Sequence, residues 1–350
     1  MISIITPTYN HQKFIGDCIK SVLAQTFQNW EMIIVDDGSS DGTGDVVALF
    51  EDERIKYIRQ ENKGIGGLSE TYNKALNMAK GDYIAIVEGD DFWPPYKLGL
   101  QAADFKDNKI VLSFGYTQII DSDGKLLGRI PRVALPAEAR TNNPIGRSSL
   151  YMMTPRILTF TFPVSVVMRK EALIRVGGFQ QPFNLSVVDH PTFLQLSLEG
   201  KFVFHDKILG FWRRHEQSTT RNRFPLILEG VQQNILFFLT EKGPQLPISQ
   251  KECERIKLKW KEFETYRWLL LGRWCLVDGE WDKARKAFRK GLVGPYGFIL
   301  GAGLRIGILL SHLHIDMELP IRLLRSLCHI KLLAVSEYLQ GGMIVDKERI

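Results

Sequence analysis

The first 120 residues alternate short apolar runs with segments of helical periodicity, and no other feature limits the possible folds as strongly. Between the runs, apolar residues recur every three or four positions, as Ile15, Cys18 and Val22 do. Strands that alternate with helices in this order form a parallel sheet with helices on both faces. We therefore predict an α/β protein with strands at 3–5, 32–35, 55–58 and 83–87.

Polar side chains gather directly after three of the four predicted strands. The first strand is followed by the sequence TPTYN, the second by Asp36 and Asp37, and the fourth by Glu88, Asp90 and Asp91. In open α/β sheets, ligands bind outside the carboxyl ends of the strands. These clusters therefore predict one shared crevice.

The three carboxylates after the apolar run 83–87 are the most unusual of these clusters. Mg²⁺ and Mn²⁺ prefer oxygen ligands, and a cation that binds a diphosphate takes only one or two carboxylates from the protein. Asp90 and Asp91 meet that requirement. A solvated acidic turn, or a cap for the helix that follows, is the alternative that the pattern leaves open.

Several other binding motifs fail in detail. The run that begins at Asp37 matches the early places of an EF-hand calcium loop, but Ala48 occupies the twelfth place, where a bidentate Glu is needed. Gly64 to Ser69 approaches a dinucleotide fingerprint but follows the third strand instead of the first. The sequence has no P-loop, and its four cysteines lie too far apart for a zinc site or a disulfide framework.

The regular alternation of strands and helices ends at about residue 110. Residues 110–215 mix strand-like and helical segments, and the chain after residue 222 is helical. We predict an α/β domain at 1–222 and a helical region at 223–350, which contains a helical hairpin around the turn at Asp278 and Gly279.

An apolar run at 297–310 lies in this helical region. It has 14 residues, fewer than the about 20 that cross a bilayer, so we expect a buried or interfacial helix. The net charge of +6 also lies in this region, since the first 220 residues carry nearly equal numbers of acidic and basic side chains. A basic surface suits an anionic membrane, and a simply solvated charged face is an equal alternative.

Features that the sequence lacks limit the partners and the compartment that we expect for the protein. It shows no nucleic-acid reading module, so we expect no nucleic-acid partner. The start, MISIITPTYN, is typical of a strand and not of a signal peptide, and the cysteine pattern fits a reducing compartment. We expect a cytoplasmic protein, either free or peripheral at the inner face of the cell membrane.

Several short segments occur in an order that resembles a known family. They are SIITPTYN, IIVDDGSSDGT, Asn62-Lys63-Gly64, AKGDYIAIVEGDD, VGGF, an acid at Asp189, and WRRHEQST. This ordered set resembles the inverting family-2 glycosyltransferases of the GT-A fold and covers about residues 1–220. The resemblance implies a mixed, mostly parallel sheet flanked by helices, followed here by a C-terminal all-helical appendage.

The resemblance implies roles for residues that bind the donor and activate the acceptor. Pro7 and Tyr9 would line the base pocket of a nucleotide-sugar donor, and Asp37 would accept the imide N–H of uracil or thymine; guanine also offers such a donor. Asp189 would be the general base. Without the family, Asp189 would be interpreted as a helix cap, because Pro191 follows closely.

The resemblance also implies a metal site for Mn²⁺ or Mg²⁺. Asp91 would be the direct ligand, Asp90 would approach the ribose or the metal shell, and His215 would hold the metal or the diphosphate from the far side. Alone, His215 would be interpreted as an exposed or ion-paired histidine. The sequence departs from the family at Glu88, which replaces an Asp, and at Val188, where an acid is common.

The implied activity is transfer of one sugar from a UDP- or dTDP-sugar to a hydroxyl of a saccharide or lipid-linked saccharide, with inversion, in cell-surface polysaccharide biosynthesis. One alternative is a nucleotidyltransferase that makes the sugar nucleotide, but TPTYN stands where that class has a G-x-G-T-R loop. The other is an inactive transferase that serves as a binding module, which the intact set of proposed site residues opposes.

Overall fold

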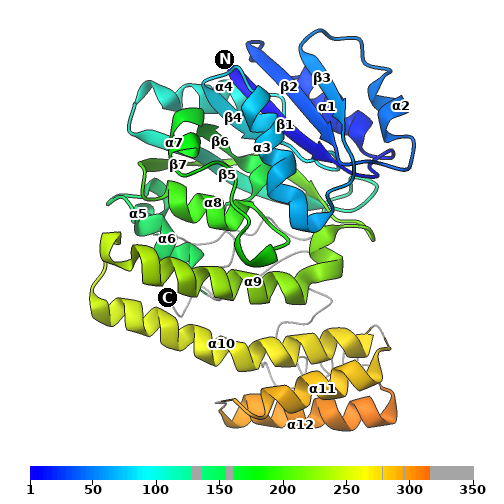
Figure 1. Cartoon of the computed structure of the whole chain (residues 1–350), viewed down its shortest axis with the longest axis vertical. Coiled ribbons are helices and arrows are strands. Elements are labelled where there is room, and N and C mark those ends of the chain that lie inside the picture. The colour runs from blue at the N-terminus through cyan, green and yellow to red at the C-terminus, as the bar shows by residue number, and fades with distance from the viewer. Residues whose placement is uncertain (128–135, 155–160, 278, 295–296, 316–350) are drawn as a thin grey trace.

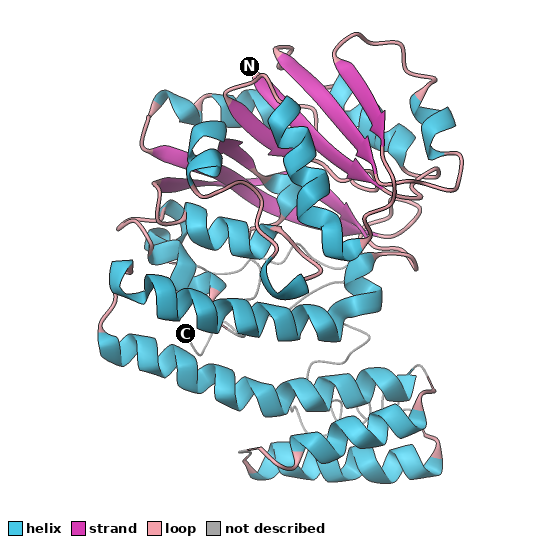
Figure 2. Cartoon of the chain, viewed as in Figure 1, coloured by secondary structure: helices cyan, strands magenta, loops and turns pink. Residues whose placement is uncertain are grey.

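Seven strands of the described residues form one sheet in the upper part of the molecule (Figures 1 and 2). The computed structural model describes residues 1–127, 136–154, 161–277, 279–294 and 297–315. The strands are β1 (Ile2–Thr8), β2 (Trp30–Asp36), β3 (Ile55–Arg59), β4 (Tyr83–Ile86), β5 (Ile110–Ile120), β6 (Val167–Arg169) and β7 (Lys201–Arg213).

The sheet is mixed and mostly parallel, as predicted. Its order is β3-β2-β1-β4-β6-β5-β7. The four strands predicted from the first 90 residues pair in parallel, β6 runs antiparallel to β4 and β5, and β7 runs parallel to β5. β1 and β2 are buried along their whole length, which explains why apolar residues predominate in both instead of alternating with polar ones.

Helices cover both faces of the sheet, and the strand residues alternate between two cores. Ile4 and Met32 pack on the face covered by α1 (Ile15–Leu23), α2 (Thr43–Val47) and α4 (Lys97–Ala102). Ile5 and Ile33 pack on the opposite face. That face is covered by α3 (Leu68–Met78), α5 (Ala137–Thr141), α6 (Arg147–Met152), α7 (Lys170–Arg175), α8 (Asp189–Leu196) and α9 (Thr219–Lys242).

Strand β7 has no counterpart among the elements predicted from the sequence. Its middle contains the polar run His205-Asp206-Lys207, which breaks any apolar or alternating pattern. The pairing of β5 with β7 shifts there, because Gly115 pairs with His205 and Tyr116 with Ile208. The exposed side chains of Asp206 and Lys207 thus bulge from the ladder without ending the strand.

The C-terminal helices form two groups. α9 and the first half of α10 (Gln250–Val277) pack into the core of the sheet domain, where Trp260 is fully buried. The second half of α10 forms a separate small core with α11 (Trp281–Gly291) and α12 (Phe298–Leu313), which confirms the predicted hairpin. The predicted domain boundary at residue 222 falls inside α9. Within the described part of the chain, no helix is long and apolar enough to span a membrane.

Candidate active site

The loops after β1, β2 and β4 meet at one edge of the sheet. The β1–β2 register places Thr8 beside Asp36, and the backbone N–H of Asp37 donates to the carbonyl of Thr8 at 2.9 Å. The N–H of Gly89 donates to the carbonyl of Pro7 at 3.1 Å. The expected shared crevice is therefore present, as a cavity of about 580 Å³.

Six of the seven residues singled out from the sequence line this cavity: Pro7, Tyr9, Asp37, Asp90, Asp91 and Asp189. The seventh, His215, contacts Asp90 directly. The cavity also has an extensive apolar wall, to which β7 contributes Trp212 and α9 contributes Leu228. Polar groups thus converge at one end of a largely apolar cleft, as is common in ligand sites.

The Asp37 carboxylate holds the loop that follows β3. It accepts hydrogen bonds from the backbone N–H groups of Lys63 at 2.9 Å and Gly64 at 3.1 Å, and from the side chain of Gln60 at 2.7 Å. A carboxylate offers about four acceptor positions, so one remains for a ligand. Gly38 has φ +78°, and a Cβ there would lie 2.8 Å from the Asn62 nitrogen. The D-D-G run and the N-x-G run therefore form one unit.

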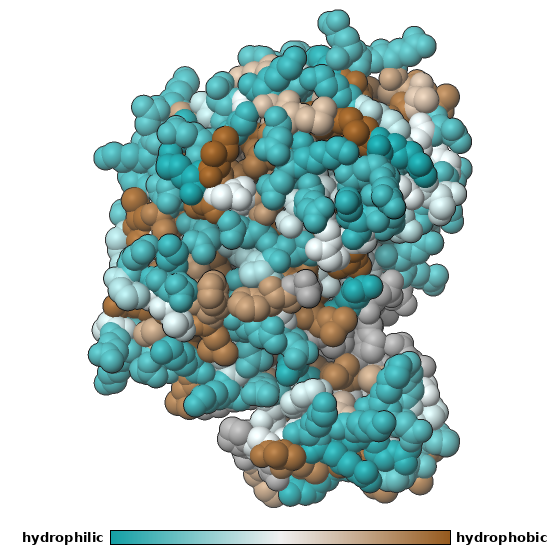
Figure 3. Space-filling model, in the orientation of Figure 1, coloured by the Kyte–Doolittle hydropathy of each residue, from teal (hydrophilic) through white to brown (hydrophobic). Residues whose placement is uncertain are grey.

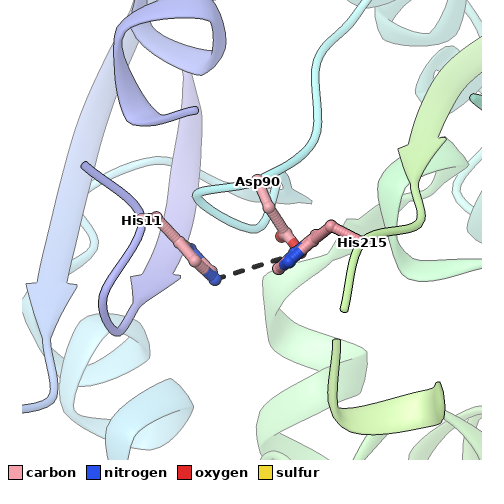
Figure 4. A group of neighbouring side chains, drawn as sticks. All are labelled: His11, Asp90 and His215. Carbon is pink, nitrogen blue, oxygen red and sulfur yellow. Dashed lines mark hydrogen bonds and ion pairs between the residues drawn. The ribbon is translucent and has the colours of Figure 1, made fainter. Parts of the chain in front are cut away.

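Asp90 lies between two histidines (Figure 4). Its Oδ2 is 3.0 Å from Nε2 of His215 and 3.9 Å from Nε2 of His11. Burial alone would raise the pKa of Asp90, but the two imidazoles lower it below its usual value. Burial in turn lowers the pKa of His11. The structure therefore favours an ionised Asp90 facing two histidine rings.

Asp91 lies in a cluster with Glu88 and Asp90, whose carboxylates are within 4.8 Å of one another, and it is held by β7. It is 2% exposed, and its Oδ1 accepts the backbone N–H of Arg213 at 2.8 Å. The guanidinium Nε of Arg213 donates to the carbonyl of Asp90 at 2.9 Å, which fixes the whole acidic loop. Burial, together with Asp90 and Glu88, raises the pKa of Asp91 well above its usual value.

Asp189 is the first residue of α8. It lines the same cavity as the loops after β1, β2 and β4. Burial raises its pKa to about 6, although backbone N–H groups at the helix start act in the other direction. The carboxylate is therefore mostly ionised at neutral pH but more basic than an ordinary Asp, which suits a general base. Asp189 lies in the first turn of α8 and is not its N-cap, which is Val188.

Two residues of this site were not singled out from the sequence. His11 follows TPTYN directly, so a metal-binding residue type at the end of a strand was the available signal. Arg213 precedes His215 by two residues in WRRHEQST, but the contacts of its side chain depend on the loop after β4 and leave no local pattern.

The chain is similar in sequence to one family model and to several known proteins. Residues 3–177, half of the chain, match the family model described as glycosyl transferase family 2. The chain belongs to glycosyltransferase family 2. Among curated members, it is 30% identical over 231 residues to the glycosyltransferase GlyG of Streptococcus pneumoniae serotype 4, which covers 65% of this chain and 75% of GlyG.

One further curated relative and one solved structure are similar to this family 2 glycosyltransferase. It is 35% identical over 166 residues to WfgD of Escherichia coli, named UDP-Glc:alpha-D-GlcNAc-diphosphoundecaprenol beta-1,3-glucosyltransferase, across 47% of this chain and 64% of WfgD. The solved mannosyltransferase PcManGT from Pyrobaculum calidifontis, in complex with GDP-Man and Mn²⁺, superposes with a TM-score of 0.52 at 19% identity, covering 89% of this chain and 80% of that one. The superposition shows that the fold is the GT-A type.

Proposed function

We propose that this glycosyltransferase transfers one sugar from a nucleotide-diphosphate donor to a hydroxyl of a saccharide or lipid-linked saccharide, with inversion at the anomeric carbon. The observation that carries the proposal is the convergence of Asp37, Asp90 and Asp189 on one cavity, with His215 bonded to Asp90 at its edge. The name of the relative WfgD, which acts on a diphosphoundecaprenol-linked sugar, supports a role in cell-surface polysaccharide biosynthesis.

The donor would lie along the edge where the loops after β1, β2 and β4 meet. Pro7 and Tyr9 line the cavity beside Asp37, whose remaining acceptor position suits the imide N–H of uracil or thymine. The first residue of α9, Thr219, also lines the cavity. The N-terminus of this long helix favours an anionic group such as the diphosphate.

The residues present fit a divalent cation. One carboxylate and two imidazoles place their ligand atoms within 4.8 Å of one another at Asp90, His11 and His215. We propose that Asp90 and His215 hold the metal and that Asp91 supports Asp90 from behind, since Asp91 is bound to the backbone of β7. A bound Mn²⁺ or Mg²⁺ supplies positive charge that stabilises the leaving diphosphate.

Asp189 would activate the acceptor. As the acceptor oxygen forms its bond to the anomeric carbon, the bond from that carbon to the diphosphate breaks, and the Asp189 carboxylate takes the proton of the acceptor hydroxyl. Attack from the face opposite the leaving group inverts the anomeric configuration. The apolar wall with Trp212 would exclude water, which otherwise competes with the acceptor.

A donor panel tests this function. We expect Mn²⁺ together with a UDP- or dTDP-sugar to stabilise the protein against heat, by about 2.7 kcal/mol at a donor concentration 100 times its Kd. CDP-sugars serve as the control, because cytosine lacks the imide N–H that Asp37 would bind, and GDP-sugars are included because guanine offers such a donor. If none of the donors stabilises the protein and none is transferred or hydrolysed, the binding-module alternative replaces the proposed enzyme. Stabilisation by GDP-sugars alone would change the donor but not the reaction.

We also propose peripheral contact with an anionic membrane at the cytoplasmic face, through α11 and α12. The surface seen over α11 in Figure 3 is largely hydrophilic. Lys286 and Arg289 of α11 are exposed. The neighbouring α12 exposes 91% of Phe298 and 57% of Leu309. Cationic side chains beside exposed apolar ones are typical of interfacial helices.

Co-sedimentation with lipid vesicles tests the membrane contact. We expect binding to vesicles that contain anionic lipid, weak binding to neutral vesicles, and loss of binding in a variant with Lys286→Glu and Arg289→Glu. Each of these charges near an anionic surface contributes about 1 kcal/mol, so the double reversal should be decisive. Equal binding of the variant and the wild type would contradict the proposal.

A further inference from the structure

We propose that His11 is a third protein ligand of the metal, beside Asp90 and His215, so that the site presents two imidazoles and one carboxylate. The inference rests on the proposed function, because it assumes that a cation binds at Asp90. It adds a residue from the loop after β1 to a site otherwise built from the loops after β4 and β7 (Figure 4).

The backbone at His11 is fixed by the loop after β2. The N–H of Asn10, which has φ 54°, donates to Ser39 Oγ at 2.9 Å, and the N–H of His11 donates to Thr43 Oγ1 at 2.9 Å. The side-chain Oδ1 of Asn10 accepts the N–H of Ser40 at 2.8 Å. The run DDGSSDGT therefore anchors the histidine as well as the base pocket, and the imidazole is held in place before any ligand arrives.

The ring orientation directs one nitrogen toward the acidic loop. Nδ1 of His11 lies 3.2 Å from Thr8 Oγ1, which leaves Nε2 facing Asp90 Oδ2. At 3.9 Å that separation is too long for a hydrogen bond. Among the described residues, no hydrogen bond is formed by this nitrogen, although only 17% of the His11 side chain is exposed. A buried, aimed and unbonded nitrogen is what a ligand position requires.

The distances match a shared ion. Ligand atoms about 2.1 Å from one cation lie about 3.0 Å apart when adjacent and about 4.2 Å apart when opposite. Nε2 of His215 and Nε2 of His11 lie 3.0 Å and 3.9 Å from the same Asp90 oxygen, within that range. The Thr8 hydroxyl would accept the Nδ1 proton of His11, which is the usual outer support of a metal-bound histidine.

Gly89 allows this approach. A Cβ at residue 89 would lie 2.8 Å from Nδ1 of His11 and would also clash with the Thr8 side chain. The glycine between Glu88 and Asp90 therefore lets the histidine loop pack directly on the acidic loop. Its φ is not in the left-handed region, so close approach is the reason for glycine here.

A third ligand of this type has a consequence for metal choice. Imidazole binds the later first-row metals better than it binds Mg²⁺, whereas carboxylate and water suit Mg²⁺. His11 therefore biases the site toward Mn²⁺ and Co²⁺. Loss of the ring should weaken Mn²⁺ binding by at least about tenfold, the lower end of what loss of an outer partner costs, and change Mg²⁺ binding less.

Pulsed electron paramagnetic resonance of bound Mn²⁺ counts the coordinated nitrogens. With Mn²⁺ and UDP, we expect two histidine nitrogens in the wild type, one in His11→Ala and one in His215→Ala, and Kd values for Mn²⁺ and Mg²⁺ are measured in parallel. His205→Ala is the matched control, because His205 is similarly buried but pairs with Asp104 at 2.7 Å. It should retain two nitrogens and wild-type affinity.

The outcomes separate this inference from the proposed function. One coordinated nitrogen in the wild type, or an unchanged count in His11→Ala, overturns the role of His11 and leaves metal-dependent transfer intact. Absence of Mn²⁺ binding in the wild type with UDP overturns both. If His11→Ala does not fold, the wild-type count with ¹⁵N-labelled histidine still decides between one nitrogen and two.

Discussion

Replacement of Asp189 by Asn is expected to reduce kcat by about 10²–10⁴-fold while donor binding remains close to that of the wild type. The amide keeps the shape of the side chain and its place at the start of α8 but cannot take the proton of the acceptor hydroxyl. A product assay with the donor that the panel selects measures the loss, and donor-induced thermal stabilisation measures binding. Asp206→Asn, on the exposed bulge of β7, is the control.

The pH dependence gives the same assignment an independent test. Because the pKa of Asp189 is raised to about 6, its carboxylate is ionised above that pH and protonated below it. The kcat/KM of the wild type should therefore be highest near neutral pH and fall as the pH drops through about 6. Turnover of Asp189→Asn near the wild-type value would refute the general-base role.

Asp90 and Asp91 are expected to respond very differently to the same change. Asp90→Asn removes the charge that faces the histidines and should lower activity by about 10²–10³-fold, equivalent to about 3–4 kcal/mol of charge stabilisation. Asp91→Asn should cost much less, because an amide oxygen can still accept the N–H of Arg213. Thermal stabilisation by Mn²⁺ with the donor should disappear in the first variant and persist in the second.

The comparison of the two variants is its own control, since both change one neighbouring carboxylate to an amide. A severe loss in Asp91→Asn with retained metal response in Asp90→Asn would restore the assignment implied by the family resemblance, in which Asp91 is the direct ligand. Equal and severe losses would indicate that the metal bridges both carboxylates.

The fold and the location of the site follow closely from sequence patterns. The buried strands β1 and β2 each contain a short apolar run, and parallel register brings their carboxyl ends together, so polar residues after each strand had to meet. Local periodicity fails at β7, where the polar residues of a bulge interrupt the strand. Pairing with β5, a contact distant in sequence, maintains the strand there.

The different contacts of Asp90 and Asp91 cannot be predicted from any local sequence pattern. Asp90 and Asp91 are adjacent and chemically identical, and the sequence alone does not show which of them bonds to β7 and which pairs with the histidines. Arg213 decides this by binding Asp91 through its backbone and the carbonyl of Asp90 through its side chain. His11 is likewise brought to the site only by its anchor on the loop after β2.

The links between the acidic loop and the end of β7 also bear on how the protein becomes active. Asp91 and Arg213 are 122 residues apart in the chain, and Asp90 and His215 are 125 apart. Contacts of such long sequence separation carry a loop-closure cost and tend to form late in folding. A chain emerging from the ribosome can pair β1, β2 and β4 long before these partners are synthesised. We therefore expect the site to be completed late in folding, once β7 has joined the sheet.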